Sequence, residues 1–332
     1  MEYRNLGNTD IKVSVISFGA WAIGGWMWGG ADEKDAINAL ETAIDMGMTS
    51  IDTAPVYGFG KSEKLVGQVI HNKRDKVQLL TKYGLRWDTD QGEFYFSSYN
   101  DNGEEVSIHR YAGPDSVILE CENSLRRLQT DFIDLYQIHW NDPTTPIEDT
   151  MVAVSKLLEQ GKIRSAGVSN YTAEQMKQAD NIINISTNQV PYSMVLRDIE
   201  QNLIPYCLDN DKGILAYSPL QRGVLTGKIT PDYKFNEGDH RPHTPYFKEP
   251  NISRINNFLA KIKLIADDNN LSIAQLVIYW TIQQPSVTSA LVGARNPIQV
   301  KENIKAGEIR LDKEVLIKIN SYLDDLHLNL DV

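Results

Sequence analysis

The stretch Ser50-Ile51-Asp52-Thr53-Ala54-Pro55-Val56-Tyr57-Gly58 follows a helical pattern that ends at Met46-Gly47. Residues 49–51 are therefore predicted to form a short buried strand, which Asp52 closes and which leads into a loop carrying Tyr57. In α/β barrels, the strand ends and the loops that leave them carry the chemistry. A phenol, with its ordinary pKa of about 10, is expected to need a lower pKa to act as a general acid near neutral pH. Because burial alone raises that pKa, the stretch predicts a cation close to Tyr57.

Strand, loop and helix alternate along the rest of the chain at the spacing of parallel βα units. After a small hairpin within residues 1–14, buried strands are predicted at residues 15–19, 49–51, 77–82, 132–139, 163–168, 185–189, 213–217 and 287–292. Helices are predicted at residues 32–46, 62–70, 115–128, 147–160, from 172, at 199–209 and at 273–284, with Asp32, Ser62 and Asp115 as the first three N-caps. Because no linker-like stretch divides these units, the sequence predicts a single (β/α)8 TIM barrel domain over residues 1–332. Its N-terminal hairpin is matched by an extra C-terminal helix at residues 312–326.

Two segments, residues 85–114 and 228–252, interrupt the alternation and are predicted to be long loops. Loops of this length inside a compact domain are usually functional lids or disordered inserts. The first segment is rich in aromatic residues, which favours an ordered lid over the strand ends. Whether it contains a hairpin of its own is left open.

The composition, with 42% hydrophobic and 23% charged residues, is that of a soluble globular protein. No apolar run approaches the roughly 20 residues of a membrane span, and residues 1–5 lack the features of a signal peptide. The net charge of −11, with no Lys/Arg stripe to offset it, argues against a nucleic-acid binder but permits an anionic small ligand. Cys121 and Cys207 form neither a disulfide framework nor a metal quartet, so we expect free thiols in a reducing cytoplasm. The sequence does not indicate an oligomeric state.

Three predicted strands end on polar residues, namely Asp52, Lys82 and His139, and Tyr57 lies on a neighbouring loop. In a barrel, all four can meet at the C-terminal face. Lys82 would supply the cation that lowers the pKa of Tyr57, Asp52 would orient Lys82, and His139 could hydrogen-bond a substrate oxygen. This set suits protonation of a carbonyl oxygen while a hydride attacks the carbonyl carbon.

Taken singly, these residues are better explained by structure, Asp52 as a turn cap, Lys82 as a solvated strand end and His139 as a core histidine. Their joint placement at strand ends reverses that balance. The role of the tryptophans is left open between packing and lining a carbonyl site, for Trp21, Trp26, Trp28 and Trp87.

Metal chemistry has little support in the sequence, because it contains no His-Glu-x-x-His spacing, and no nucleophile elbow of Gly-x-Ser-x-Gly type is present either. Metal binding by His240 and His243 in the second long loop is a remote alternative.

These motifs resemble the aldo-keto reductase superfamily, particularly bacterial members of the general-stress and inositol-locus type. The resemblance runs from Gly19-Ala20-Trp21 to Asn303. It rests on residues 51–58, on Leu80-Thr81-Lys82, on residues 125–128 and 134–139, and on residues 161–170. The resemblance implies an NAD(P)(H)-dependent oxidoreductase with Tyr57 as proton donor and Asp52, Lys82 and His139 as its partners.

The same resemblance implies a nicotinamide cofactor site. Its carboxamide would be bound by Ser169, Asn170 and Gln189, and Tyr217 would stack on its ring. The remaining implied cofactor residues, at the pyrophosphate, at the adenosine end and near the ring, are Ser218, Leu220, Gln221, Arg222, Gly223, Leu225, Gly293, Arg295, Gln299, Asn303, Ala20, Trp21 and Asp52. Small residues let backbone N–H groups approach a phosphate, and Arg222 adds charge, although it also fits a plain surface position.

The adenosine end bears on the choice of cofactor. A helix N-terminus beside Arg295 suits a 2′-phosphate, so NADP(H) is expected. Gln299 stands where many members have arginine, which keeps NAD(H) open.

We therefore expect an enzyme that reversibly reduces an aldehyde or ketone to an alcohol, with sugars, polyols, steroids and short aldehydes all left open as substrates. One alternative is a cofactor-binding regulatory subunit with slow or no turnover. Another is a metal-dependent sugar isomerase on a similar barrel, which would need clustered carboxylate and histidine ligands.

Overall fold

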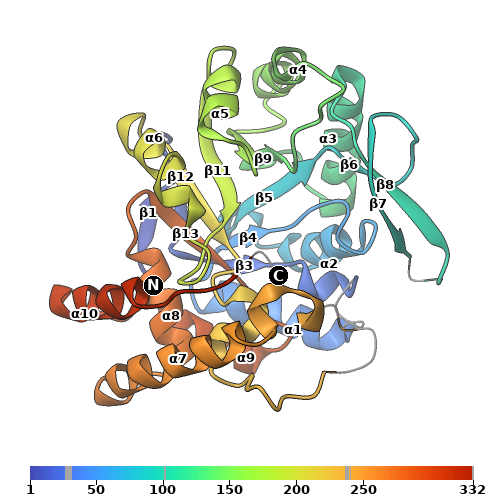
Figure 1. Ribbon diagram of the computed structural model, residues 1–332. Coiled ribbons are helices and arrows are strands. Elements are labelled where there is room, and N and C mark those ends of the chain that lie inside the picture. Colours follow the sequence, from blue (N-terminus) through green and yellow to red (C-terminus); the bar gives the residue numbers. More distant parts are fainter. Residues whose placement is uncertain (27–31, 101, 236–238, 240, 331–332) are drawn as a thin grey trace.

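Eight parallel strands close into a barrel in the order β10-β11-β12-β13-β3-β4-β5-β9 (Figure 1). The computed structural model describes residues 1–26, 32–100, 102–235, 239 and 241–330. The strands are β3 (Ile16–Gly19), β4 (Ser50–Asp52), β5 (Gln78–Tyr83), β9 (Leu135–Ile138), β10 (Ala166–Ser169), β11 (Ile185–Pro191), β12 (Gly213–Tyr217) and β13 (Val287–Gly293). The predicted TIM barrel is confirmed, and each predicted barrel strand overlaps an observed one.

Helices surround the barrel and bury their apolar faces in the core that they form with the strands. They are α1 (Glu33–Asp45), α2 (Lys61–Ile70), α3 (Pro114–Leu128), α4 (Ile147–Glu159), α5 (Ala173–Asp180), α6 (Leu203–Asp209), α7 (Asn251–Asp268), α8 (Ile273–Ile282), α9 (Pro297–Lys305) and α10 (Lys313–Asp324). The first helix begins as predicted, since the Asp32 carboxylate accepts a hydrogen bond from the Asp35 N–H at 2.8 Å. Its residues Leu40 and Ile44 are buried, and burial of such a side chain contributes roughly 1.5–3 kcal/mol.

Two predicted N-caps are wrong. Gly60 and Gly113 stand at the N-cap positions of α2 and α3, and Ser62 and Asp115 lie inside the first turns. Ser62 is fully buried, and its hydroxyl donates to the Ala20 carbonyl at 2.8 Å. The hydroxyl therefore links α2 to the barrel rim, a tertiary contact that a capping pattern cannot reveal.

Strand β9 begins three residues later than predicted, at Leu135 and not at residue 132. Asp134 explains the difference, because its carboxylate accepts the Leu79 N–H at 2.9 Å and an ion pair from Arg74 at 2.7 Å. A side chain thus takes a backbone donor that the strand ladder would otherwise use.

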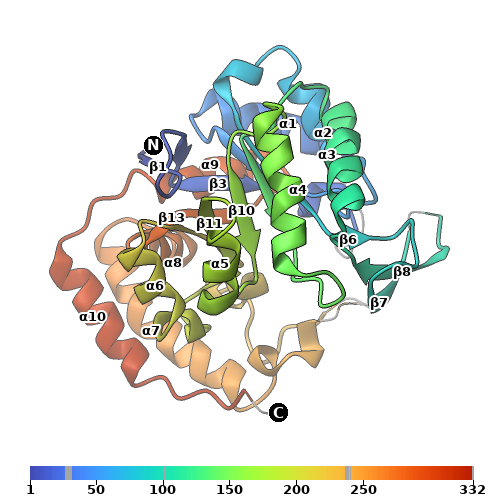
Figure 2. The same ribbon diagram turned by 90° about the horizontal axis from the view of Figure 1, so that it is seen from above.

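The N-terminal hairpin pairs β1 (Tyr3–Asn5) with β2 (Lys12–Ser14), as predicted. It lies at the end of the barrel opposite the C-terminal ends of the strands (Figure 2). The predicted extra helix is α10, which is tied to the barrel helices by the Trp280 indole N–H donating to Asn320 Oδ1 at 2.7 Å.

The two long segments contain local structure that the sequence left undefined. Residues 85–114 form a three-stranded antiparallel sheet in the order β6-β8-β7, from β6 (Leu85–Arg86), β7 (Glu93–Tyr99) and β8 (Glu105–Arg110). The insert is therefore an ordered sheet and not a loop. Residues 228–252 include two short 3-10 turns, η5 (Arg241–His243) and η6 (Pro245–Phe247).

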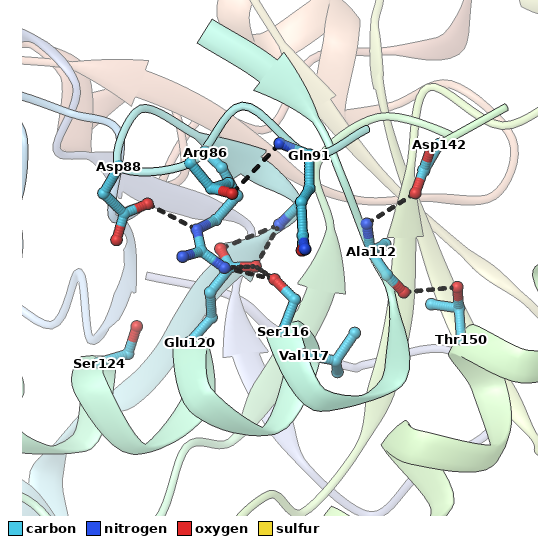
Figure 3. Close-up of polar contacts among 12 residues, drawn as sticks. Arg86, Asp88, Gln91, Ala112, Ser116, Val117, Glu120, Ser124, Asp142 and Thr150 are labelled. Carbon is cyan, nitrogen blue, oxygen red and sulfur yellow. Dashed lines mark hydrogen bonds and ion pairs between the residues drawn. The ribbon is translucent and has the colours of Figure 1, made fainter. Parts of the chain in front are cut away.

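The root of the insert is tied to α3 by a buried carboxylate, Glu120, which is 5% exposed (Figure 3). Its two oxygens accept the Gly84 N–H at 3.2 and 3.1 Å, and Oε1 also accepts from Ser116 Oγ at 3.1 Å. Arg86 of β6 lies 3.9 Å away and binds Asp88 on its other side. Burial raises the pKa of Glu120 to about 7, although Arg86 opposes the shift.

The folded-state pKa of Glu120 exceeds the unfolded value of about 4.3, so the folded protein binds more protons between these values. Stability therefore declines as pH rises from about 5 to 8 and is highest, for this group, at the acidic end. We expect the unfolding free energy of the wild type, relative to Glu120→Gln, to fall by about 3 kcal/mol over that window, measured by urea unfolding. The variant Glu122→Gln, at a half-buried glutamate on the same helix that pairs with Lys162, should keep the wild-type slope over this window. Parallel profiles for wild type and E120Q would contradict the assignment.

Candidate active site

A buried ammonium lies at the C-terminal end of β5. The Lys82 side chain is fully buried, and its Nζ lies 2.6 Å from Asp52 Oδ1, 3.0 Å from the Thr53 carbonyl and 3.3 Å from the Tyr57 hydroxyl. An ammonium has three donors, so these three contacts fix its orientation. Burial lowers the pKa of Lys82, while Asp52 beside it opposes the shift and favours the charged form.

Asp52 ends strand β4 and is held from a second side. Its Oδ2 accepts a hydrogen bond from Gln189 Nε2 at 2.8 Å, so both carboxylate oxygens are engaged. The predicted convergence is therefore observed for Asp52, Lys82 and Tyr57, and Gln189, which was expected at the cofactor, joins them through its amide. Thr53, whose carbonyl binds Lys82, was missed, because a backbone acceptor leaves no mark in the sequence.

The environment of Tyr57 corrects one expectation. The cation lies where the sequence predicts it, yet the pKa of Tyr57 is raised well above its usual value, first by burial and then by Asp52. The charge of Lys82 is largely compensated by Asp52, so it does not overcome the desolvation of the phenolate. Tyr57 is thus a neutral phenol, which is a proton donor at rest.

His139 follows β9 and lies across the site from Tyr57. The two rings meet edge to face, with centroids 5.7 Å apart. Burial, and then Lys82, lowers the pKa of His139 well below its usual value. The imidazole is therefore neutral and has one N–H to donate and one nitrogen to accept.

A buried carboxylate near Lys82 also stabilises its ammonium. Glu63 of α2 is fully buried and accepts from Thr81 Oγ1 at 2.7 Å and from Arg127 Nε at 2.6 Å. Glu63 also favours the charged form of Lys82. Arg127 belongs to the residue 125–128 motif, so part of that motif supports the site through Glu63.

Aromatic rings pack around Tyr57. Trp21 stacks on Tyr57 at 5.9 Å, and Trp26 lies 6.4 Å from Trp21. Trp87 packs on Phe59, which in turn contacts Trp26. These tryptophans belong to a cluster around Tyr57, whereas Trp28 lies outside the described residues.

The residues expected at the nicotinamide form one hydrogen-bonded group at the ends of β10, β11 and β12. Asn170 donates to the His139 carbonyl and to Ser169 Oγ at 3.0 Å each, and its Oδ1 accepts from the Tyr217 hydroxyl at 2.9 Å. Asn170 has a φ of +59°, a left-handed conformation that asparagine tolerates. Ala20, beside them on the rim, donates its N–H to the Asp52 carbonyl at 2.8 Å.

The segment after β12 has an unusual backbone. Four of its residues have positive φ, at Ser218 (+55°), Gln221 (+43°), Arg222 (+52°) and Gly223 (+98°). Left-handed residues in a turn can bring backbone N–H groups together in a concave group that binds an anion, so this segment could hold a phosphate. Leu220 and Leu225 pack beneath the segment, Leu225 being fully buried, and the Arg222 side chain is exposed.

The adenosine-side residues lie at the start of α9. Asn296 accepts the Gln299 N–H at 3.0 Å, and Gln299 Oε1 accepts the Arg295 N–H at 2.8 Å. Asn303 Nδ2 donates to the Gly293 carbonyl at 3.4 Å, and the Arg295 side chain is exposed. These residues fit a phosphate group at the helix N-terminus, with Arg295 free to reach it.

Neither a metal centre nor a membrane-spanning helix is found in the described part of the chain. Among the described residues, no group of three or more His, Cys, Asp or Glu side chains could hold a metal ion, and His240 lies outside them. No helix in the described ranges is long and apolar enough to cross a bilayer.

A TIM barrel that brings a phenol, an ammonium, a carboxylate and a neutral imidazole to its C-terminal rim has the arrangement of a carbonyl-reducing oxidoreductase. The family model for the aldo/keto reductase family matches residues 15–324, and the chain belongs to that family. This membership excludes the sugar-isomerase alternative.

The sequences of known proteins are similar to this chain over nearly its whole length. Aldo-keto reductase YhdN of Bacillus subtilis is 41% identical over 331 residues, which cover 98% of this chain and 94% of the relative. An NADH-specific methylglyoxal reductase of Escherichia coli is 35% identical over 312 residues, which cover 92% of this chain and 93% of the relative. These relatives are named as enzymes, and nothing among them supports the regulatory-subunit alternative.

Solved structures of other proteins are also similar to this chain over nearly its whole length. The glycerol dehydrogenase AKR11B4 from Gluconobacter oxydans matches with a TM-score of 0.89 at 35% identity, covering 98% of this chain and 96% of that one. An aldo/keto reductase from Klebsiella pneumoniae, in complex with NADP and acetate, matches with a TM-score of 0.72 at 30% identity, covering 98% and 96%.

Breaking the buried pair should destabilise the protein more than removing both charges. Lys82→Met leaves the Asp52 carboxylate buried without its cation, and Asp52→Asn leaves the ammonium, so each should cost about 3–5 kcal/mol. The double variant D52N/K82M should cost much less than the sum of the two. Urea unfolding of all four proteins measures this coupling. Additive losses would show that the pair is not held as a desolvated ion pair.

Proposed function

We propose that this enzyme reversibly reduces an aldehyde or ketone to an alcohol with a nicotinamide cofactor, and that Tyr57 is its general acid and base. The contact that carries the proposal is Lys82 Nζ, 3.3 Å from the Tyr57 hydroxyl and 2.6 Å from Asp52. When bound, the cofactor supplies the hydride for reduction and accepts it for oxidation.

The raised pKa of Tyr57 keeps the phenol protonated, which is the form that the reduction direction requires. A phenol that stays protonated is ready to give its proton to the carbonyl oxygen, which becomes an alkoxide and thus a far stronger base than a phenolate. As the proton leaves, charge develops on the phenol oxygen next to the Lys82 ammonium. The fixed cation therefore stabilises the transition state more than the ground state.

His139 would orient the substrate. Because its pKa is lowered, the ring is neutral at physiological pH, and it can donate one N–H to the carbonyl oxygen without competing as an acid. Its ring lies 5.7 Å from that of Tyr57, close enough for both to reach one oxygen atom.

The cofactor is proposed to be NADP(H), with its 2′-phosphate at Arg295 and the N-terminus of α9. Its pyrophosphate would lie on residues 218–225, and its carboxamide beside Ser169, Asn170 and Gln189, with Tyr217 stacked on the nicotinamide ring. The positive φ angles of residues 218 and 221–223 support this placement. Relatives of both kinds exist, because the Escherichia coli enzyme is named NADH-specific and the Klebsiella structure holds NADP.

The proposed compartment is the cytoplasm and the proposed partner is a small carbonyl or alcohol. Cys121 and Cys207 are both buried free thiols, in keeping with a reducing compartment. The names of the relatives, a methylglyoxal reductase and a glycerol dehydrogenase, support a small polar substrate.

Tyr57→Phe removes the proton donor and keeps the ring stacked on Trp21. We expect the kcat for carbonyl reduction to fall at least 100-fold, within the range that general acid catalysis contributes. The affinity for NADPH, measured by fluorescence quenching, should stay within about twofold because no cofactor contact is assigned to that oxygen. Full activity in Y57F would reject the mechanism.

Cofactor preference tests the role of Arg295. NADPH should bind more tightly than NADH in fluorescence titrations, and Arg295→Ala should reduce that preference about tenfold while leaving the NADH affinity unchanged. Arg310→Ala, at another exposed arginine, serves as the control. A wild-type preference for NADH would refute the 2′-phosphate assignment.

A further inference from the structure

The inserted sheet carries an irregularity next to the active site. Phe94 of β7 pairs with His109 of β8, and Phe96 pairs with Ile108, so Tyr95 has no partner of its own and forms a β-bulge. Bulges shift the alternation of side chains and are frequent beside active sites, where they re-aim a side chain.

The shift places two consecutive aromatic residues on the inner side of the insert. Phe94 and Tyr99 point outward and are 55% and 64% exposed. Phe96 and Ser98 point inward onto Trp26, through a stacked ring pair at 6.2 Å and a hydrogen bond from the indole N–H to Ser98 Oγ at 2.8 Å. Tyr95 joins this inner side, because it belongs to the same aromatic cluster as Tyr57. Without the bulge, strict alternation would turn Tyr95 away from the site.

Three contacts hold the Tyr95 ring. Its centroid lies 5.6 Å from Trp140, the residue after His139, and 5.2 Å from Phe96. The Arg110 guanidinium lies 4.9 Å from the ring, and Arg110 is itself paired with Glu93. These three contacts restrict the orientation of the Tyr95 ring, so the surrounding residues also fix the position of its hydroxyl.

The Tyr95 hydroxyl makes no hydrogen bond to the described part of the chain, although the ring is packed. It is therefore available to a bound ligand. Tyr95 and Tyr57 belong to the same aromatic cluster, Tyr95 from the insert and Tyr57 from the barrel rim. Burial raises the pKa of Tyr217, and Tyr57 and then Tyr95 add to that shift.

We propose that Tyr95 is a specificity-determining residue whose hydroxyl hydrogen-bonds a hydroxyl or second oxygen of the substrate, next to the carbonyl that Tyr57 and His139 hold. The enzyme would then favour small carbonyl compounds that carry an adjacent oxygen over unsubstituted aldehydes of similar size. The proposal rests on the proposed reductase function, because it takes the position of the reacting carbonyl from it.

The sign of the preference follows from hydrogen-bond energetics. A positioned donor contributes modestly when it is paired, and a site built around it disfavours an analogue that leaves it without a partner. The effect should therefore separate two aldehydes that differ in the neighbouring hydroxyl, and it should be absent for the unsubstituted one.

The test compares D-glyceraldehyde with butanal, each at saturating cofactor. Tyr95→Phe removes only the hydroxyl and keeps every ring contact, and Tyr99→Phe, at an outward-facing tyrosine on the same strand, is the matched control. We expect Y95F to lower kcat/KM for D-glyceraldehyde about five- to tenfold, mainly through KM, with less than twofold change for butanal. Y99F should behave as wild type with both. Equal losses for both aldehydes, or no loss for either, would overturn the proposal.

A binding measurement separates this proposal from the reductase function. In the Tyr57→Phe background, D-glyceraldehyde binding to the cofactor complex can be followed by tryptophan fluorescence, since Trp140 adjoins Tyr95. Adding Y95F should weaken binding about five- to tenfold, and adding Y99F should not. Unchanged binding in the Y95F double variant would refute the role of Tyr95 while leaving the reductase function intact. A wild-type enzyme that reduces neither aldehyde would instead refute the reductase function and, with it, this proposal.

Discussion

The ion pair between Lys82 and Asp52 is the constraint on which the site depends. Both side chains are almost fully buried, and a buried charge is tolerated only when it is paired and its remaining hydrogen-bonding groups are satisfied. The barrel meets that condition with the Thr53 carbonyl, the Gln189 amide and the Tyr57 hydroxyl. Strands β4, β5 and β11 must therefore stay in register, because a shift of one residue would turn these side chains to the other face. The chemistry and the closure of the barrel are thus linked by the same contacts.

The sequence predicted the barrel because eight buried strands and their helices leave a strong periodic pattern, and it predicted that Asp52, Lys82 and Tyr57 converge because strand ends share one rim. The direction it predicted for the pKa of Tyr57, a lowering by Lys82, was wrong. The direction depends on how completely the phenol is desolvated and on how far Asp52 cancels the Lys82 charge, and both are tertiary quantities. The caps at Ser62 and Asp115 were wrong for a related reason, since a buried hydroxyl and a first-turn carboxylate match the local pattern of a cap.

The strands of the insert could not be predicted from the hydrophobic pattern of the sequence. Its aromatic residues indicated order, but the pairing of β7 with β8 was hidden because the bulge at Tyr95 interrupts the alternation that identifies a strand. The same bulge aims Tyr95 inward. The residue that anchors the insert to α3, Glu120, could not be predicted either, because a carboxylate on a helix is expected to face water. The contact with Gly84 and the nearby Arg86 connect this helix to the strand that carries Lys82.

These features divide the site into a fixed part and an adaptable part. The proton-donating group is surrounded by partners from the barrel itself, so a substitution there disturbs a desolvated charge and affects folding as well as activity. The wall formed by the insert contributes aromatic rings and the Tyr95 hydroxyl, and its strands lie outside the closed barrel. A change on that wall alters which molecule fits without exposing the ion pair to solvent. Substrate selectivity can therefore change through the insert while the chemistry at Tyr57 stays the same, because different backbone hydrogen bonds hold each part.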